Sequence, residues 1–572
     1  MAIEAGRGRT RGLGWLAWLV LAAAWFATLQ SRPLFDPDEG RYAEIPREMV
    51  ATGDWLTPRL DGLKYFEKPP LQYWATATAY SLFGLSEWTA RLWTVGLAFV
   101  CFPMVFGWTR RLYGYRAGLA AVVALAVSPY FGVIGHLNLL DAGFSFWLTG
   151  AVFAFTLAQC SPAKSRDERR WMLLAWLAAA LAILGKGIVV GVLAGASLFV
   201  YSVVERDIRP WKRLQPALGL PLFLLVCAPW FIAVSLRNPD FAGFFFIHEH
   251  FARFLTTVHK RSEPVYFFLP LLLFGVLPWG ASIVGACRFA WRDAGQQVQP
   301  AEAQPVDERR IEGPRVDGLR ADERPFKPLR FLLIFSVITL AFFSASGSKL
   351  APYIQPMFPP LAAIVGAYAA GRSSFLRQVA IIVSVIAVIA AVGLLIYSAL
   401  HNAYIPQAAL IWAGTAVAVV LGVVVATWRR QASGAAGPAV AIAAAAAFAW
   451  QCFMSALAVT PPAHSARDLV AATRPYVHPQ TELFSVGQYR ETISPYLRRT
   501  LTLVGFEGEL EFGLHAEPGR QAAAPEEFVS RWRASRDAVA FFGPKVWDEY
   551  RRKGLPGRVI AADNNTVAVT RS

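Results

Sequence analysis

The sequence predicts a polytopic α-helical membrane protein of about 13 transmembrane helices, with a small soluble α/β domain at its C-terminal end. The 572 residues are 55% hydrophobic and only 16% charged, with a mean hydropathy of +0.39. Apolar runs of roughly 17 to 23 residues recur along the chain, and a run of that length crosses a hydrocarbon core of about 30 Å. Beyond residue 459 the apolar runs become short and charged residues return.

The charge distribution argues against nucleic acid as a partner. The net charge is +16, but residues after 459 hold 15 Lys and Arg against 13 Asp and Glu. The excess therefore belongs to the membrane part, where basic loops set orientation. The five cysteines lie in or beside apolar runs without CxxC spacing, which indicates packing residues rather than disulfides or metal ligands.

Basic residues also predict the orientation of the first span. Arg7, Arg9 and Arg11 hold the N-terminus in the cytoplasm, so a span at 13–30 delivers the following segment to the outside. A signal peptide is the alternative for this start, and it sends the next segment outward as well. The stretch 71–84 is aromatic and too short to span, which favours a helix in the membrane interface.

The remaining spans alternate across the membrane. We expect them near 90–109, 117–134, 141–159, 171–186, 187–204, 214–236, 265–287, 330–346, 351–370, 379–400, 407–427 and 438–458. Basic loops then stay inside and the C-terminal tail lies outside. The transmembrane domain covers 1–458, with outer loops at 31–89 and 237–264 and an inside loop at 288–329.

The tail, 459–572, has the pattern of a separate α/β domain. Helix-like stretches such as "PEEFVSRWRAS" alternate with strand-like ones such as "TELFSVG", "DAVAFFG" and "TVAVT". Asn564 and Asn565 are expected to turn a terminal hairpin. We expect this domain to cover the active cavity.

Acidic residues crowd the first outer loop, in "DPDEGRY" at 36–42. A helix is expected to begin near Asp38, whose carboxylate can cap it, and to end before Gly53. Asp38, Arg41 and Tyr42 then share one face. Asp141, at the outer end of its span, is a costly position for a carboxylate, so a functional role competes with helix capping there.

Cations on the outer side oppose the orientation rule and therefore carry information. Lys186 in "GKG", Lys349 in "GSKLAPY" and Arg253 in the loop 237–264 are all expected there. They favour a bound phosphate, for which Lys and Arg are the usual partners. Snorkelling of single lysines is the alternative.

The segment "HEH" at 248–250 raises the question of a metal. Adjacent helical positions point in different directions, so this is not the i, i+4 pairing of HExxH. His248 and Glu67 together are candidates for a divalent metal site, such as zinc. Polar packing or a phosphate contact is the competing interpretation.

These motifs resemble a known family. "DPDEGRYAEIPREMVATGDWLTPRLDGLKYFEKPPLQYW" is similar to the first outer loop of bacterial 4-amino-4-deoxy-L-arabinose transferases acting on lipid A, which are GT-C membrane glycosyltransferases. The similarity continues through Asp141, "GKG", "SKLAPYIQP" and the tail. The double proline in "EKPPLQYW" is common to the wider group of polyprenyl-phosphate sugar transferases.

The resemblance implies transfer of the amino sugar from undecaprenyl phosphate to a lipid A phosphate, with resistance to polymyxin and other cationic peptides as the outcome. It also implies that the active site faces the periplasm of a bacterial inner membrane, so that the outer loops and the tail are periplasmic and the inside loops cytoplasmic. The sequence shows no requirement for a cofactor, apart from the possible divalent metal already considered. The implied partners are the lipid-linked donor, lipid A and membrane lipids.

The candidate residues take roles in that reaction. Lys68 and Arg253 are the first choices for the leaving phosphate, with Arg41, Lys186 and Lys349 as further phosphate ligands. Asp38 is expected to orient the acceptor, take a residual proton or stabilise the anomeric carbon. Asp141 or Glu67 would receive the cationic amine, and Tyr42 and Tyr65 would pack against the sugar, although membrane anchoring competes for these aromatics.

Two other functions fit part of the pattern. A related transferase that glycosylates proteins or another glycan would share most of these motifs. A lipid transporter or flippase needs charges distributed for two access states, whereas here they are expected at one face.

Overall fold

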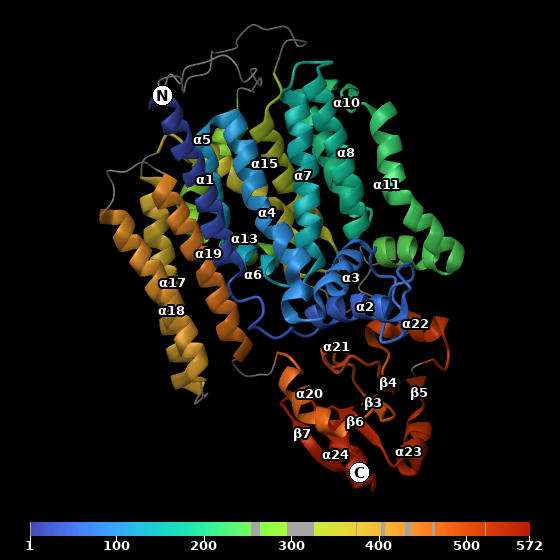
Figure 1. The fold of residues 1–572 in the computed structure, drawn as a ribbon. Helices are drawn as coiled ribbons and strands as arrows, with labels where there is room; N and C mark the ends of the chain where they lie inside the picture. The colour runs from blue at the N-terminus through green and yellow to red at the C-terminus, as the bar shows by residue number, and fades with distance from the viewer. Residues whose placement is uncertain are drawn as a thin grey trace.

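The computed structural model describes residues 2–252, 263–293, 325–372, 374–401, 406–429, 436–459, 464–520 and 522–571. A bundle of long helices forms one body, and an α/β domain from residue 464 onward (the C-terminal domain) lies against one end of it. Helix α1 (Ala2–Phe26) begins at the other end (Figure 1).

Every predicted span falls on one helix or on consecutive helices. The bundle consists of α1 (Ala2–Phe26), α4 (Glu87–Tyr113), α5 (Tyr115–Ala126), α6 (Pro129–Gly135), α7 (Leu140–Cys160), α8 (Arg166–Lys186), α9 (Val189–Glu205), α11 (Pro216–Arg237), α13 (Phe268–Val276), α14 (Gly280–Trp291), α15 (Pro328–Ala345), α16 (Phe358–Ala369), α17 (Phe375–His401), α18 (Gln407–Arg429) and α19 (Ala436–Val459).

Eight helices in the described residues are long and apolar enough to cross a membrane, or nine if the bent pair α5 and α6 is one span. This makes the chain a multi-pass membrane protein. Helix α7 is the central one, since 83% of its apolar window is buried, against 11% for α18. Apolar residues left exposed on outer helices such as α18 suit contact with lipid.

The first loop folds into α2 (Asp38–Thr52), a short hairpin β1 (Arg59–Leu60) and β2 (Leu63–Lys64), and α3 (Leu71–Phe83). Helix α2 ends as predicted at Gly53, whose φ of +73° favours glycine. The expectation that Asp38 caps α2 is wrong. Pro37 is the N-cap, and the Asp38 carboxylate lies inside the first turn, 3.2 Å from Arg41.

The C-terminal domain is built on a six-stranded sheet of order β5-β4-β3-β6-β8-β7. Strands β3 (Glu482–Val486), β4 (Thr502–Val504), β5 (Ala522–Ala523) and β6 (Ala538–Phe542) are parallel, and β7 (Arg558–Ala562) and β8 (Val567–Thr570) form an antiparallel hairpin. The predicted turn is confirmed, with Asp563 accepting the backbone N–H groups of Asn565 and Thr566 at 2.8 Å. The helices are α20 (Arg467–Thr473), α21 (Ile493–Leu497), α22 (Glu511–Ala516), α23 (Pro525–Ala534) and α24 (Pro544–Arg552).

Helix α2 is the main contact between the two bodies. Gly40 lies so close to the C-terminal domain that a Cβ there would come within 2.6 Å of the Glu491 carbonyl carbon. Backbone cannot yield as the end of a flexible side chain can, so glycine is required by close approach.

Replacing Gly40 by alanine is therefore expected to loosen this contact, at a cost of about 1–3 kcal/mol for an overpacked site. The measurement is the rate at which a protease releases the C-terminal domain from the bundle. Gly96→Ala in α4 is the control, because no heavy atom lies within 4 Å of that added methyl group. Equal release rates in the two variants would contradict the prediction.

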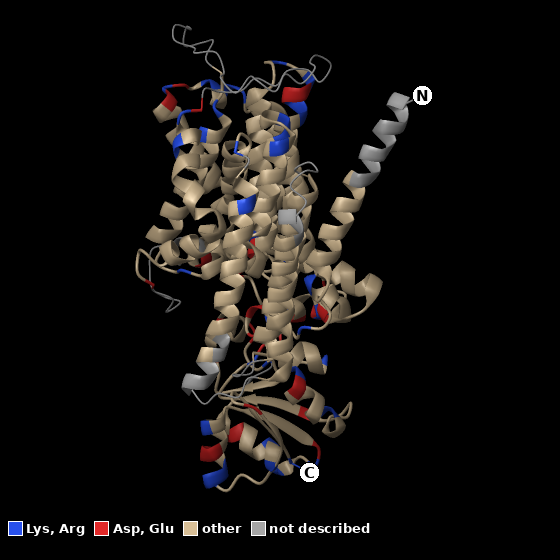
Figure 2. Ribbon diagram, turned by 90° about the vertical axis from the view of Figure 1, so that its left-hand side faces the viewer, with Lys and Arg blue, Asp and Glu red and all other residues tan. Residues whose placement is uncertain are grey.

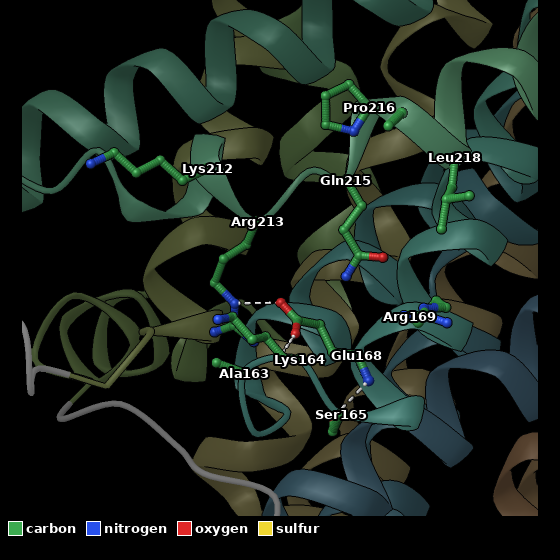
Figure 3. A pocket seen from close by; sticks show the side chains of 11 residues that line it. Ala163, Lys164, Ser165, Glu168, Arg169, Lys212, Arg213, Gln215, Pro216 and Leu218 are labelled. Carbon is green, nitrogen blue, oxygen red and sulfur yellow. Dashed lines mark hydrogen bonds and ion pairs between the residues drawn. The ribbon is translucent and has the colours of Figure 1, made fainter.

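The end of the bundle away from the C-terminal domain collects basic residues (Figure 2). It includes the turns that precede α8 and α11, which sequence analysis predicted to share a side with the N-terminus. A cavity of about 450 Å³ lies between these turns (Figure 3), and none of the predicted site residues lines it. The predicted residues that the structure describes lie elsewhere.

Candidate functional site

Arg41 is the centre of a charged cluster shared by the bundle and the C-terminal domain. Its buried guanidinium lies 3.2 Å from Asp38, 3.9 Å from Glu491, and forms an ion pair with Glu509. Sequence analysis missed both glutamates, since nothing local in the tail distinguishes them from other surface acids. Burial, together with the neighbouring Glu509 carboxylate, raises the pKa of Glu491 well above its ordinary value.

Three tyrosines surround this cluster. The Tyr42 ring lies 6.3 Å from that of Tyr73 and 5.7 Å from the Arg41 guanidinium. The buried hydroxyls of Tyr65 and Tyr73 and the Nε of Arg41 have no hydrogen-bond partner within the described residues. Buried polar atoms are nearly always paired, so three such atoms close together mark a candidate position for a ligand.

Glu67, Lys68 and His248 gather beside Glu249. Lys68 Nζ donates to the Glu67 carbonyl oxygen at 2.8 Å and lies 3.5 Å from the Glu249 carboxylate. His248 Nδ1 is 3.5 Å from the other oxygen of Glu249, on the π-helical segment Gly243–Ala252. π-Helical turns are frequent at functional sites.

Glu67 and His248 are the pair that sequence analysis proposed for a divalent metal. Across the described ranges there is no group of three or more His, Cys, Asp and Glu side chains placed to hold a metal ion. Zinc at Glu67 and His248 stays a prediction. Arg253, the other first choice for the leaving phosphate, lies outside the described residues.

Asp141 and Lys186 form an ion pair between the first turn of α7 and the last residue of α8. Asp141 therefore does not serve as the cap of α7, whose N-cap is Leu139. The Lys186 ammonium also lies 4.4 Å from the Tyr353 ring centre. Each charge compensates the other, which explains how the buried Asp141 carboxylate and the largely enclosed Lys186 ammonium are tolerated.

Lys349 is buried and held by backbone oxygens. Its Nζ donates to the carbonyl of Ser346 at 2.7 Å and to that of Glu263 at 2.9 Å. In this arrangement the ammonium stabilises the turn before the 3₁₀ helix Ala351–Met357. A role for Lys349 with phosphate stays a prediction.

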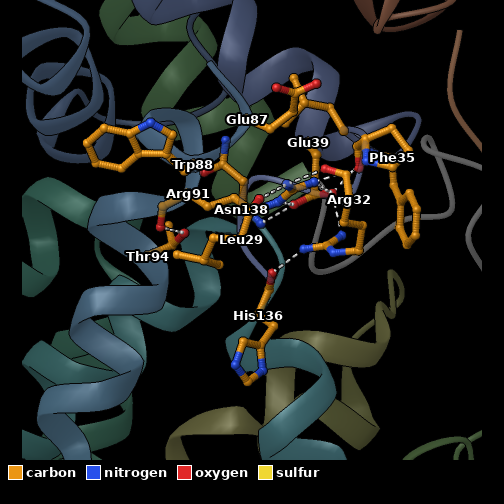
Figure 4. A network of polar contacts seen from close by, with 12 residues as sticks. Leu29, Arg32, Phe35, Glu39, Glu87, Trp88, Arg91, Thr94, His136 and Asn138 are labelled. Carbon is orange, nitrogen blue, oxygen red and sulfur yellow. Dashed lines mark hydrogen bonds and ion pairs between the residues drawn. The ribbon is translucent and has the colours of Figure 1, made fainter. Parts of the chain in front are cut away.

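Glu39, which sequence analysis passed over, is the most enclosed acid of "DPDEGRY" (Figure 4). It pairs with Arg32 at 2.9 Å and Arg91 at 2.7 Å, and accepts the backbone N–H groups of Phe35 and Asn138. Burial alone would raise its pKa, but the two guanidiniums lower the pKa of Glu39 to about 2. A carboxylate fixed as an anion cannot exchange protons at neutral pH, so Glu39 is structural.

The crowding of acids in "DPDEGRY" thus has three explanations. Glu39 joins the first loop to α4, and Asp36 accepts from Arg490 at 2.7 Å and from the Thr492 N–H at 3.0 Å in the C-terminal domain. Asp38 has the most accessible carboxylate of the three, with 37% of its side chain exposed. It is the acid of this segment that a substrate reaches most readily.

A second acidic group lies between α2 and the C-terminal domain. Asp61 accepts the Leu501 N–H at 2.8 Å and the Ser494 hydroxyl at 3.1 Å. Burial raises the pKa of Asp61 to about 8, although the Leu501 N–H opposes this, and burial with Glu44 nearby raises the pKa of Glu48.

The contact between the first loop and the C-terminal domain is therefore expected to weaken as pH rises. Asp61 binds a proton in the folded protein up to about pH 8, but only up to about pH 4 when unfolded. The folded state holds more protons between these values, so stability falls with rising pH across that window. The measurement is the melting temperature from pH 4 to 9 in the parent and in Asp61→Asn, whose amide cannot ionise and should flatten the profile. A parallel profile in the variant would contradict this assignment.

Comparisons with known proteins find matches to both the helix bundle and the C-terminal domain. A family model described as aminoarabinose transferase C-terminal domain matches residues 469–571, and one described as dolichyl-phosphate-mannose-protein mannosyltransferase matches 19–245. The undecaprenyl phosphate-alpha-4-amino-4-deoxy-L-arabinose arabinosyl transferase of Aeromonas salmonicida is 33% identical over 62% of this chain and 59% of its own length. The arabinosyl transferase 1 of Sodalis glossinidius, which carries the same description, is 34% identical over 64% of this chain and 61% of its own length. The alignments thus span about three fifths of these relatives.

A solved structure matches over nearly the whole chain. The crystal structure of ArnT from Cupriavidus metallidurans bound to undecaprenyl phosphate is 32% identical, with a TM-score of 0.84 over 98% of both chains. Bundle and C-terminal domain are thus matched together, as are the two segments covered by the family models. The chain belongs to the ArnT family of aminoarabinose transferases, within the GT-C membrane glycosyltransferases.

Proposed function

We propose that this protein transfers 4-amino-4-deoxy-L-arabinose from undecaprenyl phosphate to a phosphate of lipid A, and so confers resistance to polymyxin and other cationic peptides. The observation that carries the proposal is the match over 98% of both chains to a relative whose structure holds undecaprenyl phosphate. The curated relatives named as arabinosyl transferases support the same sugar. We place the reaction at the periplasmic face of the inner membrane, on the side of the C-terminal domain.

The reaction is a substitution at the anomeric carbon. An oxygen of the acceptor phosphate forms the new bond to this carbon, and the bond to the donor's phosphate oxygen breaks. The leaving undecaprenyl phosphate takes the electron pair. The acceptor is already anionic, so the reaction does not require a strong base, and fixed cations can stabilise the leaving phosphate.

The residues take roles that suit this chemistry. Lys68 would face the leaving phosphate, with Arg253, Lys186 and Lys349 as further cations. Asp38 would orient the acceptor or stabilise the positive anomeric carbon. The buried hydroxyls of Tyr65 and Tyr73, which have no partner among the described residues, would hold the sugar ring beside Tyr42.

Acids at the same end suit a cationic sugar. The Asp141 carboxylate pairs with Lys186, and Glu67 lies beside Lys68. When a phosphate draws one of these lysines away, the acid that was paired with it would bind the sugar amine instead. Such exchange keeps every buried charge paired throughout the reaction.

The test is the mass of lipid A after expression of this chain in a bacterium that makes the lipid-linked amino sugar but lacks its own transferase. Lipid A should gain the mass of one aminoarabinose, and polymyxin resistance should rise. The second candidate is another polyprenyl-phosphate sugar transferase, which the mannosyltransferase model over 19–245 favours. Unmodified lipid A alongside a newly glycosylated protein would decide for that candidate.

A further inference from the structure

The cavity at the end of the bundle away from the C-terminal domain has the features of a separate lipid-binding site. It lies between the turn that joins α7 to α8 and the turn that joins α10 (Arg209–Lys212) to α11 (Figure 3). Four basic residues line it against one acidic residue: Lys164, Arg169, Lys212 and Arg213 against Glu168.

Two of these charged side chains already bind other parts of the protein. Arg213 Nε donates to Glu168 at 2.6 Å, and its other nitrogens donate to the carbonyl oxygens of Ala158, Gln159 and Ser161 at the end of α7. Arg213 and Glu168 therefore form the frame of the cavity.

The other three cations have no ionic partner in the part of the chain that the structure describes. Lys164, Arg169 and Lys212 are exposed, and within the described residues their side chains form no ion pair. A concave surface that carries three positive charges attracts an anion, and phosphate is an anion that Lys and Arg both bind well. The preference for basic residues on one side of a membrane explains charge at this end, but it does not explain a cavity.

Gln215 adds a polar contact of a different kind. Its backbone has a φ of +51°, and its side chain extends among the residues that line the cavity (Figure 3). The side-chain oxygen is buried and has no hydrogen-bond partner within the described residues. Such an acceptor suits a hydroxyl donor, which a phosphate does not supply but a polyol headgroup does.

An apolar surface continues from the cavity along α11. Leu218 lines the cavity with 50% of its surface exposed, and Leu225, which lies two turns further along the same side of the helix, is 73% exposed. Only 22% of the apolar window of α11 is buried, so this helix faces lipid. A headgroup in the cavity would have its acyl chains on this surface.

We propose that the cavity binds an anionic phospholipid with a hydroxyl-bearing headgroup, of the phosphatidylglycerol type. Lys164, Arg169 and Lys212 hold the phosphate, Gln215 accepts from a glycerol hydroxyl, and the acyl chains lie along α11. The site is separate from the Arg41 cluster and does not depend on the proposed transfer reaction.

The test is native mass spectrometry of the full-length protein in detergent, titrated with phosphatidylglycerol or phosphatidylcholine. Each cation near a membrane surface contributes about 1 kcal/mol, or about fivefold in affinity. The triple variant K164Q/R169Q/K212Q should therefore bind phosphatidylglycerol about a hundredfold more weakly. Phosphatidylcholine should bind weakly to parent and variant alike.

The matched control is R166Q/R170Q/R206Q, which removes three exposed charges from the same end of the bundle without touching the cavity. It should bind phosphatidylglycerol as the parent does. Equal losses in the two triple variants, or equal binding of the two lipids by the parent, would overturn the proposal. Displacement of the lipid by glycerol phosphate at equal concentration would also overturn it, since a free anion would then account for the site.

Discussion

Replacing Asp38 by asparagine is expected to lower the rate of sugar transfer by roughly 100-fold to 10,000-fold, the range typical of a lost acid–base or charge-stabilising group. Asp38 is the most accessible carboxylate at Arg41, with 37% of its side chain exposed, against 12% for Glu491 and 13% for Glu509. Asparagine keeps the shape but not the charge. Because Glu509 still pairs with Arg41, the fold of the loop should survive.

The measurement is transfer of the sugar to lipid A in membranes containing equal amounts of each variant. Asp54→Asn is the control, since Asp54 lies in the same loop but accepts backbone N–H groups from Leu56 and Thr57, which an amide oxygen can also do. Parent-like transfer by the Asp38 variant would remove this residue from the mechanism and leave the fold untouched.

Replacing Glu39 by alanine should instead destabilise the protein, by about 3–5 kcal/mol, because it leaves two buried guanidiniums without their anion. Arg32 and Arg91 are almost fully enclosed and converge on this one carboxylate. The expected result is a lower melting temperature and a smaller yield of folded protein, with Glu39→Gln between alanine and the parent.

Glu549→Ala provides the comparison for that loss. Glu549 pairs with Lys553 at 2.6 Å on the exposed face of α24, where both charges stay in water. Its removal should leave the melting temperature unchanged. Equal melting temperatures for the Glu39 and Glu549 variants would mean that the buried Glu39 network stabilises the protein no more than an exposed ion pair does.

The helices were predictable because their signal is local. Apolar runs mark the spans directly, Gly53 ends α2, and the shortness of 71–84 sets α3 apart from the spans. The two-residue strand β5 left no pattern, since alternation needs more residues than it has. The residue at the start of α2 was wrongly given a capping role, because capping and ion pairing both draw an aspartate to a first turn.

The site was predictable only in part, because the folded structure decides which charged side chains pair with one another. Asp38 and Glu39 are adjacent acids, and sequence alone does not show which of them meets Arg32 and Arg91. Asp141 and Lys186 were both expected at the outer ends of their spans, but as separate ligands rather than as a pair. Glu491 and Glu509 lie in the tail, and only the docking of that domain brings them to Arg41.

The way α2 meets the C-terminal domain bears on how hybrid enzymes should be designed. Asp36, Gly40, Arg41 and Asp61 each meet a specific partner there, either an ionic group or a piece of backbone. Replacing the C-terminal domain by that of a relative would break those contacts unless the first loop of the same relative were transferred as well. The exchangeable module is therefore a discontinuous pair of segments, and a chimera with its only junction near residue 460 should be inactive even when both halves fold.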